Sequence, residues 1–283
     1  MSRGNSKSST IIDAHQHFWV RGRGDYAWLT PDLVPIYRDF LPQDLIPELD
    51  RHNIGRTILV QAAPTLSETR FLLDIAQQTD FVAGVVGWID MESPDALNQI
   101  SELCNYPLFL GIRPMIQDLE DSEWMLQPSL NAVYGCLVAT GKTFDALVRP
   151  HHLRPLLKLV EQHPDLPVII NHAGKPAIGD SAFDMWADEI ALMKNKENVF
   201  CKFSGMLTEA GPGATEKDLE QYVNHLINIF SADRLVWGSD WPVLNLACNY
   251  STWFQMAQSA LSGLNVEQQQ AVFGRNAMKF YGL

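Results

Sequence analysis

Histidine, arginine and aspartate side chains stand at the ends of several apolar runs of this sequence. His15 and His17 end the first run and His172 ends a later one, while Arg113 and Asp240 close two others. Imidazoles and carboxylates act as general bases and metal ligands, and arginine stabilises developing negative charge. Burying such groups without partners costs several kcal/mol, so their recurrence at strand ends indicates a common site.

Eight short runs rich in apolar and β-branched residues recur along the 283-residue chain. Most are continuous rather than alternating, which is typical of parallel strands buried on both faces. His15 and His17 are two residues apart, so a strand would point both side chains the same way. The predicted strands cover residues 10–15, 56–61, 82–89, 108–113, 143–148, 167–172, 198–204 and 234–239.

Longer segments with helix signals separate these runs. The signals are Ser67 before a helix over 68–79, Ser93-Pro94 before one over 95–104, and capping boxes at Thr215/Asp218 and Asn265/Gln268 before two later helices. Eight uninterrupted strand–helix units predict an α/β fold, a single-domain (β/α)8 TIM barrel over residues 11–283, preceded by a disordered leader at residues 1–10. A doubly wound sheet is disfavoured because Gly22 and Gly24 lack the G-x-G-x-x-G spacing of a dinucleotide site.

The composition excludes several classes of partner. With 21 Lys+Arg against 33 Asp+Glu, the formal net charge is −12, which disfavours nucleic acid. The most apolar run, residues 81–89, is far shorter than the roughly 20 residues of a membrane helix. Residues 1–10 lack a signal core, and the four scattered cysteines argue against a zinc-thiolate site. We expect a cytoplasmic protein with a small-molecule partner, as a monomer or a homo-oligomer.

A barrel of this kind carries its active site at the carboxyl ends of its strands. Gln61 ends the second predicted strand, Trp88 lies in the third and Asp145 in the fifth. Lys202 and Ser204 lie at the end of the seventh. These side chains are therefore predicted near the rim that carries the histidines.

Several motifs resemble those of the amidohydrolase superfamily. They are Asp13-Ala-His15-Gln-His17, Asn171-His172-Ala-Gly-Lys175-Pro and Gly238-Ser239-Asp240-Trp241-Pro242. The chain is most similar to the branch of sugar-lactone hydrolases that includes L-fuconolactonase-like and L-rhamnonolactonase-like proteins. This likeness spans nearly the whole chain and adds Gly24-Asp-Tyr26-Ala-Trp28-Leu, Gly111-Ile-Arg113-Pro, Phe144-Asp145-Ala-Leu-Val-Arg149-Pro and Phe273-Gly-Arg-Asn-Ala.

The resemblance implies a metallo-dependent hydrolase that opens a sugar (aldono-) lactone, such as L-fucono-1,5-lactone or L-rhamnonolactone, to the sugar acid. Asp240 is then the base that takes a proton from water, and a somewhat raised pKa or metal-activated water would suit it. Arg113 stabilises the oxyanion. His15, His17, His172 and Asp240 bind one divalent metal, with Zn²⁺ as first choice, or the histidines polarise the substrate directly if no metal is required.

The two-metal site of the superfamily is not expected here. It needs a bridging carboxylated lysine and a further histidine on the middle strands, where this chain has Arg113 and Asp145. A sugar lactone has an apolar ring face and hydroxyl groups. The expected substrate-binding residues are Tyr26, Trp28, Trp88 and Trp241 against the ring, and Gln61, Asp145 and Lys175 as hydrogen-bonding partners.

Each assignment has a simpler structural alternative. Ion-pair networks, satisfied loop backbone and solvated helix ends account for many polar residues near strand ends. In these alternatives Arg113 only pairs with a carboxylate, Asp145 only pairs with Arg149, Lys175 and Ser204 satisfy backbone, and His151 and His152 form a solvated helix start.

Three other activities remain open at this stage. A non-oxidative decarboxylase of the same superfamily uses the same histidines and aspartate, but needs basic and aromatic residues for an aromatic acid. A hydrolase of an anionic, muconolactone-type lactone needs extra arginines. A barrel that binds a sugar acid without catalysis is the third alternative, although a pure binder has no need of a base at Asp240.

Overall fold

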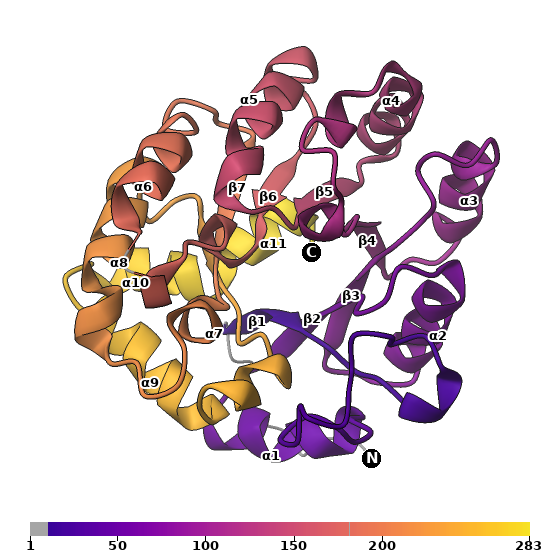
Figure 1. Ribbon diagram of the computed structural model, residues 1–283. Coiled ribbons are helices and arrows are strands. Elements are labelled where there is room, and N and C mark those ends of the chain that lie inside the picture. The colour runs from indigo at the N-terminus through magenta and orange to yellow at the C-terminus, as the bar shows by residue number, and fades with distance from the viewer. Residues whose placement is uncertain (1–10, 181) are drawn as a thin grey trace.

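Eight parallel strands form a barrel in the computed structural model, which describes residues 11–180 and 182–283 (Figure 1). Each strand pairs with the next in sequence order, which confirms the predicted (β/α)8 architecture. The strands are β1 (Ile12–Gln16), β2 (Arg56–Val60), β3 (Val82–Gly87), β4 (Phe109–Ile112), β5 (Thr143–Ala146), β6 (Val168–Ile170), β7 (Val199–Phe203) and β8 (Leu235–Trp237). The predicted leader at residues 1–10 lies outside the described residues.

Each strand is shorter than its predicted run, and β1 ends one residue later than predicted, at Gln16. Gln61, Arg113, His172 and Ser239 follow the last paired residues of β2, β4, β6 and β8. These residues turn from the sheet into the loops at the carboxyl ends of the strands, where a barrel carries its site.

The barrel closes between β1 and β8 through a bridge rather than a regular ladder. Gln16 bridges Trp241 in parallel fashion. The backbone N–H of Asp240 donates to the carbonyl of His15 at 2.7 Å, and that of His17 donates to the carbonyl of Trp241 at 2.7 Å. The seam of the barrel therefore runs directly through the residues of the predicted site.

A bulge in β1 changes the direction of its side chains. Against β2, the pairing steps from Asp13 to Gln16 on β1 while β2 advances only from Thr57 to Leu59. An extra residue in one strand bends it and re-aims the side chains beyond it. The bulge thus lies between Asp13 and Gln16, the segment that carries His15, just before His17 at the rim.

Helices surround the barrel, as Figure 1 shows. Their bounds are α1 (Pro42–Arg51), α2 (Leu66–Gln77), α3 (Ala96–Leu103), α4 (Asn131–Thr140), α5 (Leu153–Gln162), α6 (Phe183–Ala191), α7 (Met206–Ala210), α8 (Glu216–Phe230), α9 (Tyr250–Ala260), α10 (Val266–Gln270) and α11 (Asn276–Tyr281). Amphipathic helices bury their apolar stripes against the sheet, which makes the main core of the protein.

Two of the predicted helix starts are confirmed and two are wrong. Capping boxes open α8 at Thr215 and α10 at Asn265. In α2, Thr65 rather than Ser67 is the N-cap, because its hydroxyl accepts from the backbone of Glu68 at 3.0 Å. In α3, the N-cap is Asp95, without a capping side-chain bond, because residues 91–95 form turns first.

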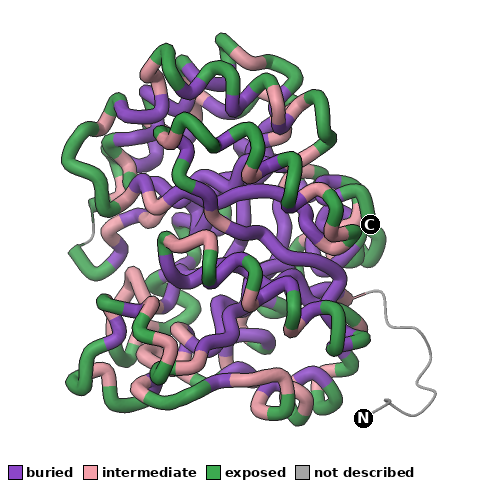
Figure 2. Tube along the Cα trace, turned by 90° about the vertical axis from the view of Figure 1, so that its right-hand side faces the viewer, coloured by how far each residue is buried: buried purple, intermediate pink, exposed green. Residues whose placement is uncertain are grey.

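Buried residues run through the interior of the barrel (Figure 2, purple). Within it, a second, smaller apolar cluster packs strand residues against α11. It consists of Ile12, Ala14, Ile58, Val60, Val86, Leu110, Ile169, Phe200, Val236, Ala277, Phe280 and Tyr281. The C-terminal helix therefore contributes to the packing of the barrel strands. In the described part of the chain, no helix has the length and apolarity needed to cross a bilayer.

Candidate active site

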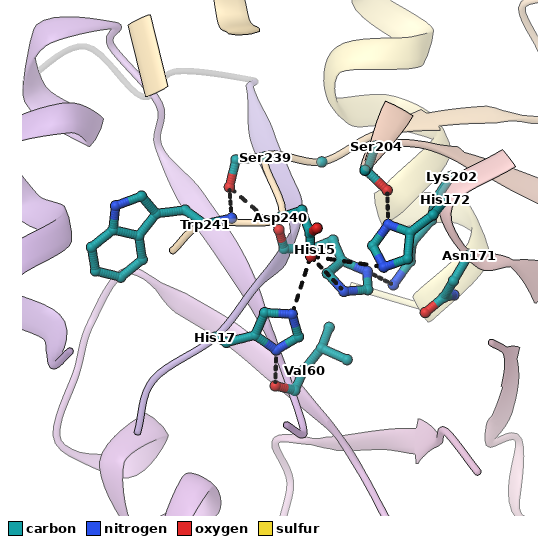
Figure 3. A network of polar contacts seen from close by, with 12 residues as sticks. His15, His17, Val60, Asn171, His172, Lys202, Ser204, Ser239, Asp240 and Trp241 are labelled. Atoms are coloured by element: carbon teal, nitrogen blue, oxygen red, sulfur yellow. Dashed lines mark hydrogen bonds and ion pairs between the residues drawn. The ribbon is translucent and has the colours of Figure 1, made fainter. Parts of the chain in front are cut away.

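Three histidine side chains converge on one carboxylate at the carboxyl ends of the strands (Figure 3). Nε2 of His17 lies 3.3 Å from Oδ1 of Asp240, and Nε2 of His15 and that of His172 each lie 3.7 Å from the same oxygen. All four side chains are buried. The structure thus brings together the four residues that the sequence analysis proposed as metal ligands.

The backbone is strained at two of these residues. Asp240 has a φ of 61°, and four consecutive residues, His172, Ala173, Gly174 and Lys175, have φ values of 51°, 54°, 71° and 50°. A left-handed conformation costs an L-residue roughly 1–2 kcal/mol, so it persists only where other contacts hold it. Strain of this kind is typical of functional sites, and here it sets the direction of an imidazole and of the central carboxylate.

Asp13 holds the turn that carries Asp240. Its Oδ1 accepts from the backbone N–H of Ser239 at 2.8 Å. The Ser239 hydroxyl oxygen in turn accepts from the backbone N–H of Trp241 at 3.0 Å. These bonds tie β1 to the segment after β8 and fix the backbone on both sides of Asp240.

Each imidazole also has a partner for its second nitrogen. Nδ1 of His17 lies 2.8 Å from the carbonyl oxygen of Val60, and Nδ1 of His172 lies 3.0 Å from the hydroxyl of Ser204. Nδ1 of His15 lies 3.2 Å from Nζ of Lys202. A carbonyl can only accept, so the proton of neutral His17 is on Nδ1 and the lone pair on Nε2 faces Asp240.

Burial sets the charge states of the site. It lowers the pKa of His172 to about 3 and lowers the pKa values of His15 and His17, so all three imidazoles are neutral at pH 7. Burial also acts to raise the pKa of Asp240, but His172, His17 and Lys175 outweigh it and bring that pKa below its usual value. Asp240 is therefore ionised at neutral pH, without the raised pKa that would suit a base.

Arg113 lies beside this cluster and is held by β2. Its Nη2 donates to the carbonyl of Gln61, and the amide of Gln61 donates back to the carbonyl of Arg113 at 2.7 Å. Its Nη1 lies 3.4 Å from Nε2 of His15. The guanidinium is thus fixed next to the imidazoles. The structural alternative for Arg113 expected a direct pair with a carboxylate, but the partner of its Nη2 is a backbone carbonyl.

Asp145 does not pair with Arg149. Its Oδ2 lies 2.7 Å from Nζ of Lys202 and accepts from the hydroxyl of Tyr281 at 2.9 Å. Both members of the Lys202–Asp145 pair are fully buried. The side chain of Asp145 on β5 points into the barrel, so it meets Lys202 from β7 rather than the arginine in the loop.

A cavity of about 280 Å³ opens onto the histidine cluster. Of the predicted site residues, it brings together His17, Trp28, Arg113, His172, Lys175 and Asp240. Trp28 also lines a neighbouring cavity of about 420 Å³, and Trp88 lies there. Asp240 and two of the imidazoles therefore face a space that a small molecule can enter.

The other predicted substrate contacts lie outside the lining of this cavity, as far as the described residues show. Gln61 holds Arg113, and Asp145 holds Lys202. The indole of Trp241 points away from the cluster (Figure 3) and packs 5.2 Å from the ring of Phe40. Tyr26 is buried. Gln61 and Asp145 thus bind other polar residues, and Trp241 and Tyr26 belong to the packed core.

His151 and His152 form a short 3-10 turn before α5. His151 is exposed, as expected for a solvated helix start. His152 is buried, and its Nδ1 accepts from the backbone N–H of Arg149 at 3.1 Å. The interpretation of His152 as solvated is therefore wrong, because the ring turns back and accepts a hydrogen bond from the backbone of its own loop.

Several lining residues were not singled out from the sequence. They are Ala62, Met115, Gln117, Asp118, Leu147, Thr208, Glu209, Val243 and Leu246. All of them follow strand ends, in the loops or short helices where the barrel rule expects site residues. The carboxylate of Asp118, in the segment after β4, is a signal that sequence reasoning could have used.

The donor set at the centre of the cluster fits a divalent metal. One nitrogen each from His15 and His17 and one oxygen from Asp240 all lie within 4.8 Å of one another. The lone pairs of His17 Nε2 and Asp240 Oδ1 face each other, an arrangement that a shared proton or a cation stabilises. His15 has a competing contact, because Arg113 lies within 3.4 Å of its Nε2.

Comparison with known proteins agrees with the family resemblance over nearly the whole chain. The amidohydrolase family model matches residues 12–283. An L-fucono-1,5-lactonase from Burkholderia ambifaria is 44% identical over 95% of this chain and 94% of its own length. An L-fucono-1,5-lactonase from Burkholderia multivorans is 32% identical over 96% of both chains.

A solved structure agrees with the fold in detail. The crystal structure of an amidohydrolase from Burkholderia multivorans with bound zinc superimposes with a TM-score of 0.92. It is 30% identical in sequence and covers 97% of this chain and 100% of its own. The family match, the curated relatives and the shared barrel agree with the motifs that carry the histidine cluster, and this chain belongs to the amidohydrolase family.

Proposed function

We propose that this protein hydrolyses a sugar lactone, such as L-fucono-1,5-lactone or L-rhamnonolactone, to the sugar acid. The observation that carries the proposal is the position of Asp240, which lies among three neutral imidazoles and faces a small cavity beside Arg113. Two relatives named L-fucono-1,5-lactonase support the choice of substrate.

In this mechanism Asp240 accepts a proton from a water molecule as that water attacks the lactone carbonyl carbon. The carbonyl oxygen becomes an oxyanion, which Arg113 stabilises with a guanidinium held in place by Gln61. When the tetrahedral centre collapses, the ring C–O bond breaks. The protonated Asp240 then returns its proton to the leaving ring oxygen, and the product is the open-chain acid.

The charges that face the cavity favour an uncharged substrate. Its charged lining residues are the cations Arg113 and Lys175 and the anions Asp118, Glu209 and Asp240. An aromatic acid or a muconolactone-type anion needs an excess of cations. This lining has no such excess, so neither the decarboxylase nor the anionic-lactone alternative is favoured.

The substrate contacts divide into two groups in this proposal. Trp28 and Lys175 line the cavity and contact the sugar directly, and Trp88 contacts a substituent that extends into the neighbouring cavity. Gln61 and Asp145 act through Arg113 and Lys202, which they hold. Tyr26 supports Trp28 through Trp19, whose ring packs against both. Trp241 supports the same aromatic wall from farther away, because it packs against Phe40, which contacts Trp19.

We further propose zinc as a bound metal, held by His17, His172 and Asp240 with His15. When bound, zinc would polarise the lactone carbonyl and lower the pKa of a coordinated water. The test is the thermal unfolding midpoint of chelator-treated protein with and without added zinc. A rise in wild type that is absent in His17→Ala supports the site, and no rise in wild type contradicts it.

The reaction is tested by acid release in weak buffer from L-fuconolactone, L-rhamnonolactone, L-galactonolactone and D-gluconolactone. Wild type is compared with Asp240→Asn and with Asp184→Asn, a matched change at an exposed position of α6. Hydrolysis of one lactone that is lost only in Asp240→Asn supports both the reaction and the base. Equal rates in all three proteins remove Asp240 from this role, and no hydrolysis by wild type overturns the proposal.

A cytoplasmic location and an assembly into homo-oligomers also remain predictions, as does the lack of nucleic-acid or membrane partners. Size-exclusion chromatography with light scattering tests the oligomeric state, and cell fractionation tests the location.

A further inference from the structure

A partly buried ion pair lies beside the candidate active site. Lys175 ends the left-handed turn after β6, and Glu209 lies on α7, the short helix after β7. Nζ of Lys175 contacts Oε1 of Glu209 directly, and the two side chains are each 18% exposed. Both residues line the cavity that contains Asp240.

Lys175 lies close enough to the reacting centre to matter there. Its charge contributes to the lowered pKa values of both His172 and Asp240. Without Glu209, it would present a second cation to the space where hydrolysis creates a carboxylate. The first cation is Arg113, which lines the same cavity.

The two sides of the proposed reaction differ in charge. The lactone is neutral, whereas the sugar acid released from it is an anion at neutral pH. A site with an unpaired lysine would bind the product more tightly than the substrate, because opposite charges attract strongly in a partly buried space.

We propose that Glu209 is a specificity-determining residue that neutralises Lys175 and so makes the site select an uncharged lactone over a sugar-acid anion. The inference rests on the proposed function for its substrate, but it concerns binding and not turnover. Lys175 remains available to the hydroxyl groups of a neutral sugar, while its charge is balanced by Glu209. Opposite-charge pairs of this kind set which ligands are rejected as well as which are accepted.

The test is the affinity of L-fuconate and L-galactonate, measured by isothermal titration calorimetry at low salt. We expect Glu209→Gln to bind these anions about tenfold more tightly than wild type, which is the scale of one unmasked charge near a protein surface. Glu220→Gln, the same change at an exposed position of α8, is the matched control and should bind as wild type does. The gain in Glu209→Gln should shrink in high salt.

A second change separates charge from structure. In Glu209→Gln/Lys175→Met the unmasked cation is gone, so the anion affinity should return to the wild-type level or below it, since the contacts of Lys175 with the hydroxyl groups are lost too. If Glu209→Gln binds the anions no better than wild type, or if the gain persists in the double variant, the inference is wrong. If Glu209→Gln does not fold, Glu209→Ala replaces it, because alanine leaves no amide that needs a partner.

The outcome is independent of the proposed hydrolysis. Anion binding is measured without turnover. If wild type opens no lactone but Glu209→Gln gains anion affinity, the proposed function is wrong and the proposed role of Glu209 is supported. If wild type opens lactones but Glu209→Gln gains no anion affinity, the proposed function is supported and the proposed role of Glu209 is wrong.

Discussion

A Cβ atom on Gly205 would lie 2.5 Å from Nδ1 of His172. Real Cβ atoms essentially never approach another atom so closely, and φ at Gly205 is 65°, in the region that glycine tolerates best. The backbone after β7 therefore passes directly against the imidazole. Together with the Ser204 hydroxyl, it holds a ring whose own backbone is already strained.

This contact predicts that Gly205→Ala displaces His172. We expect at least a 100-fold loss of kcat/KM, because a displacement of about 1 Å at a reacting group has effects of that size. Overpacking should also lower the free energy of unfolding by about 1–3 kcal/mol. Lactone hydrolysis and urea denaturation measure the two effects.

The matched control is Gly135→Ala. Gly135 is exposed in the middle of α4, and a Cβ there meets nothing within 4 Å. Alanine should raise the free energy of unfolding by about 0.5–1 kcal/mol and leave the activity unchanged. Full activity in Gly205→Ala would show that the ring does not depend on this close approach.

Lys202 gives a second prediction, because it joins the buried carboxylate of Asp145 to His15. Lys202→Met leaves Asp145 without its cation and should cost about 3–5 kcal/mol of unfolding free energy. It also removes the partner of Nδ1 of His15. The loss of a group that holds a functional imidazole typically lowers activity by about 10–100-fold.

The double variant Lys202→Met/Asp145→Asn separates these effects. Removing the uncompensated charge should restore part of the stability, whereas kcat should stay low because His15 is still not held. KM should change little, since neither residue lines the cavity described here. Recovery of kcat together with stability would mean that Lys202 has only a structural role.

Trp28 gives a third prediction at the wall between the two cavities. Its ring lines both, and its Nε1 donates to the carbonyl of Ala62 at 2.7 Å. Trp28→Ala should raise KM for the lactone by about tenfold, because an aromatic wall contributes on the order of 1 kcal/mol or more to binding. Trp28→Phe retains the ring and should raise KM less. Equal KM values in wild type and both variants would remove Trp28 from the substrate site.

The barrel and the histidine cluster were readable from the sequence for a physical reason. Continuous apolar runs predict buried parallel strands, and His15, His172 and Asp240 each stand where such a run ends. Strand ends of a barrel meet at one rim, so residues far apart in the sequence could be placed together without knowledge of their contacts.

The directions of individual side chains were not readable in the same way. Asp145 and Lys202 lie on different strands and form an ion pair only because both side chains point into the barrel. Trp241 turns outward to pack against Phe40, although it follows Asp240 directly. Glu209 lies on a five-residue helix, too short for a periodic signal. Such features follow from the closed barrel, not from local pattern.

The last prediction concerns Glu68, a buried carboxyl on α2 that holds the backbone after β2. Its Oε1 accepts from the backbone N–H of Ala62 at 2.9 Å, and the carboxyl group is fully buried. Burial raises the pKa of Glu68 from 4.5 to about 8. The folded protein therefore binds this proton more tightly than the unfolded chain does.

The sign of the effect on stability follows from this difference. The contribution of Glu68 to the free energy of unfolding should fall as pH rises from about 4.5 to about 8, because ionisation of Glu68 then favours the unfolded chain. Between pH 7 and pH 8 we expect a loss of about 1 kcal/mol in wild type. This window lies above the ordinary pKa of histidine and below that of a thiol, so Glu68 dominates it. Glu68→Gln has no proton to lose and should show a flat profile in urea denaturation at the two pH values. The exposed change Glu220→Gln should follow wild type, and a Glu68→Gln profile as steep as that of wild type would assign the pH dependence to another group.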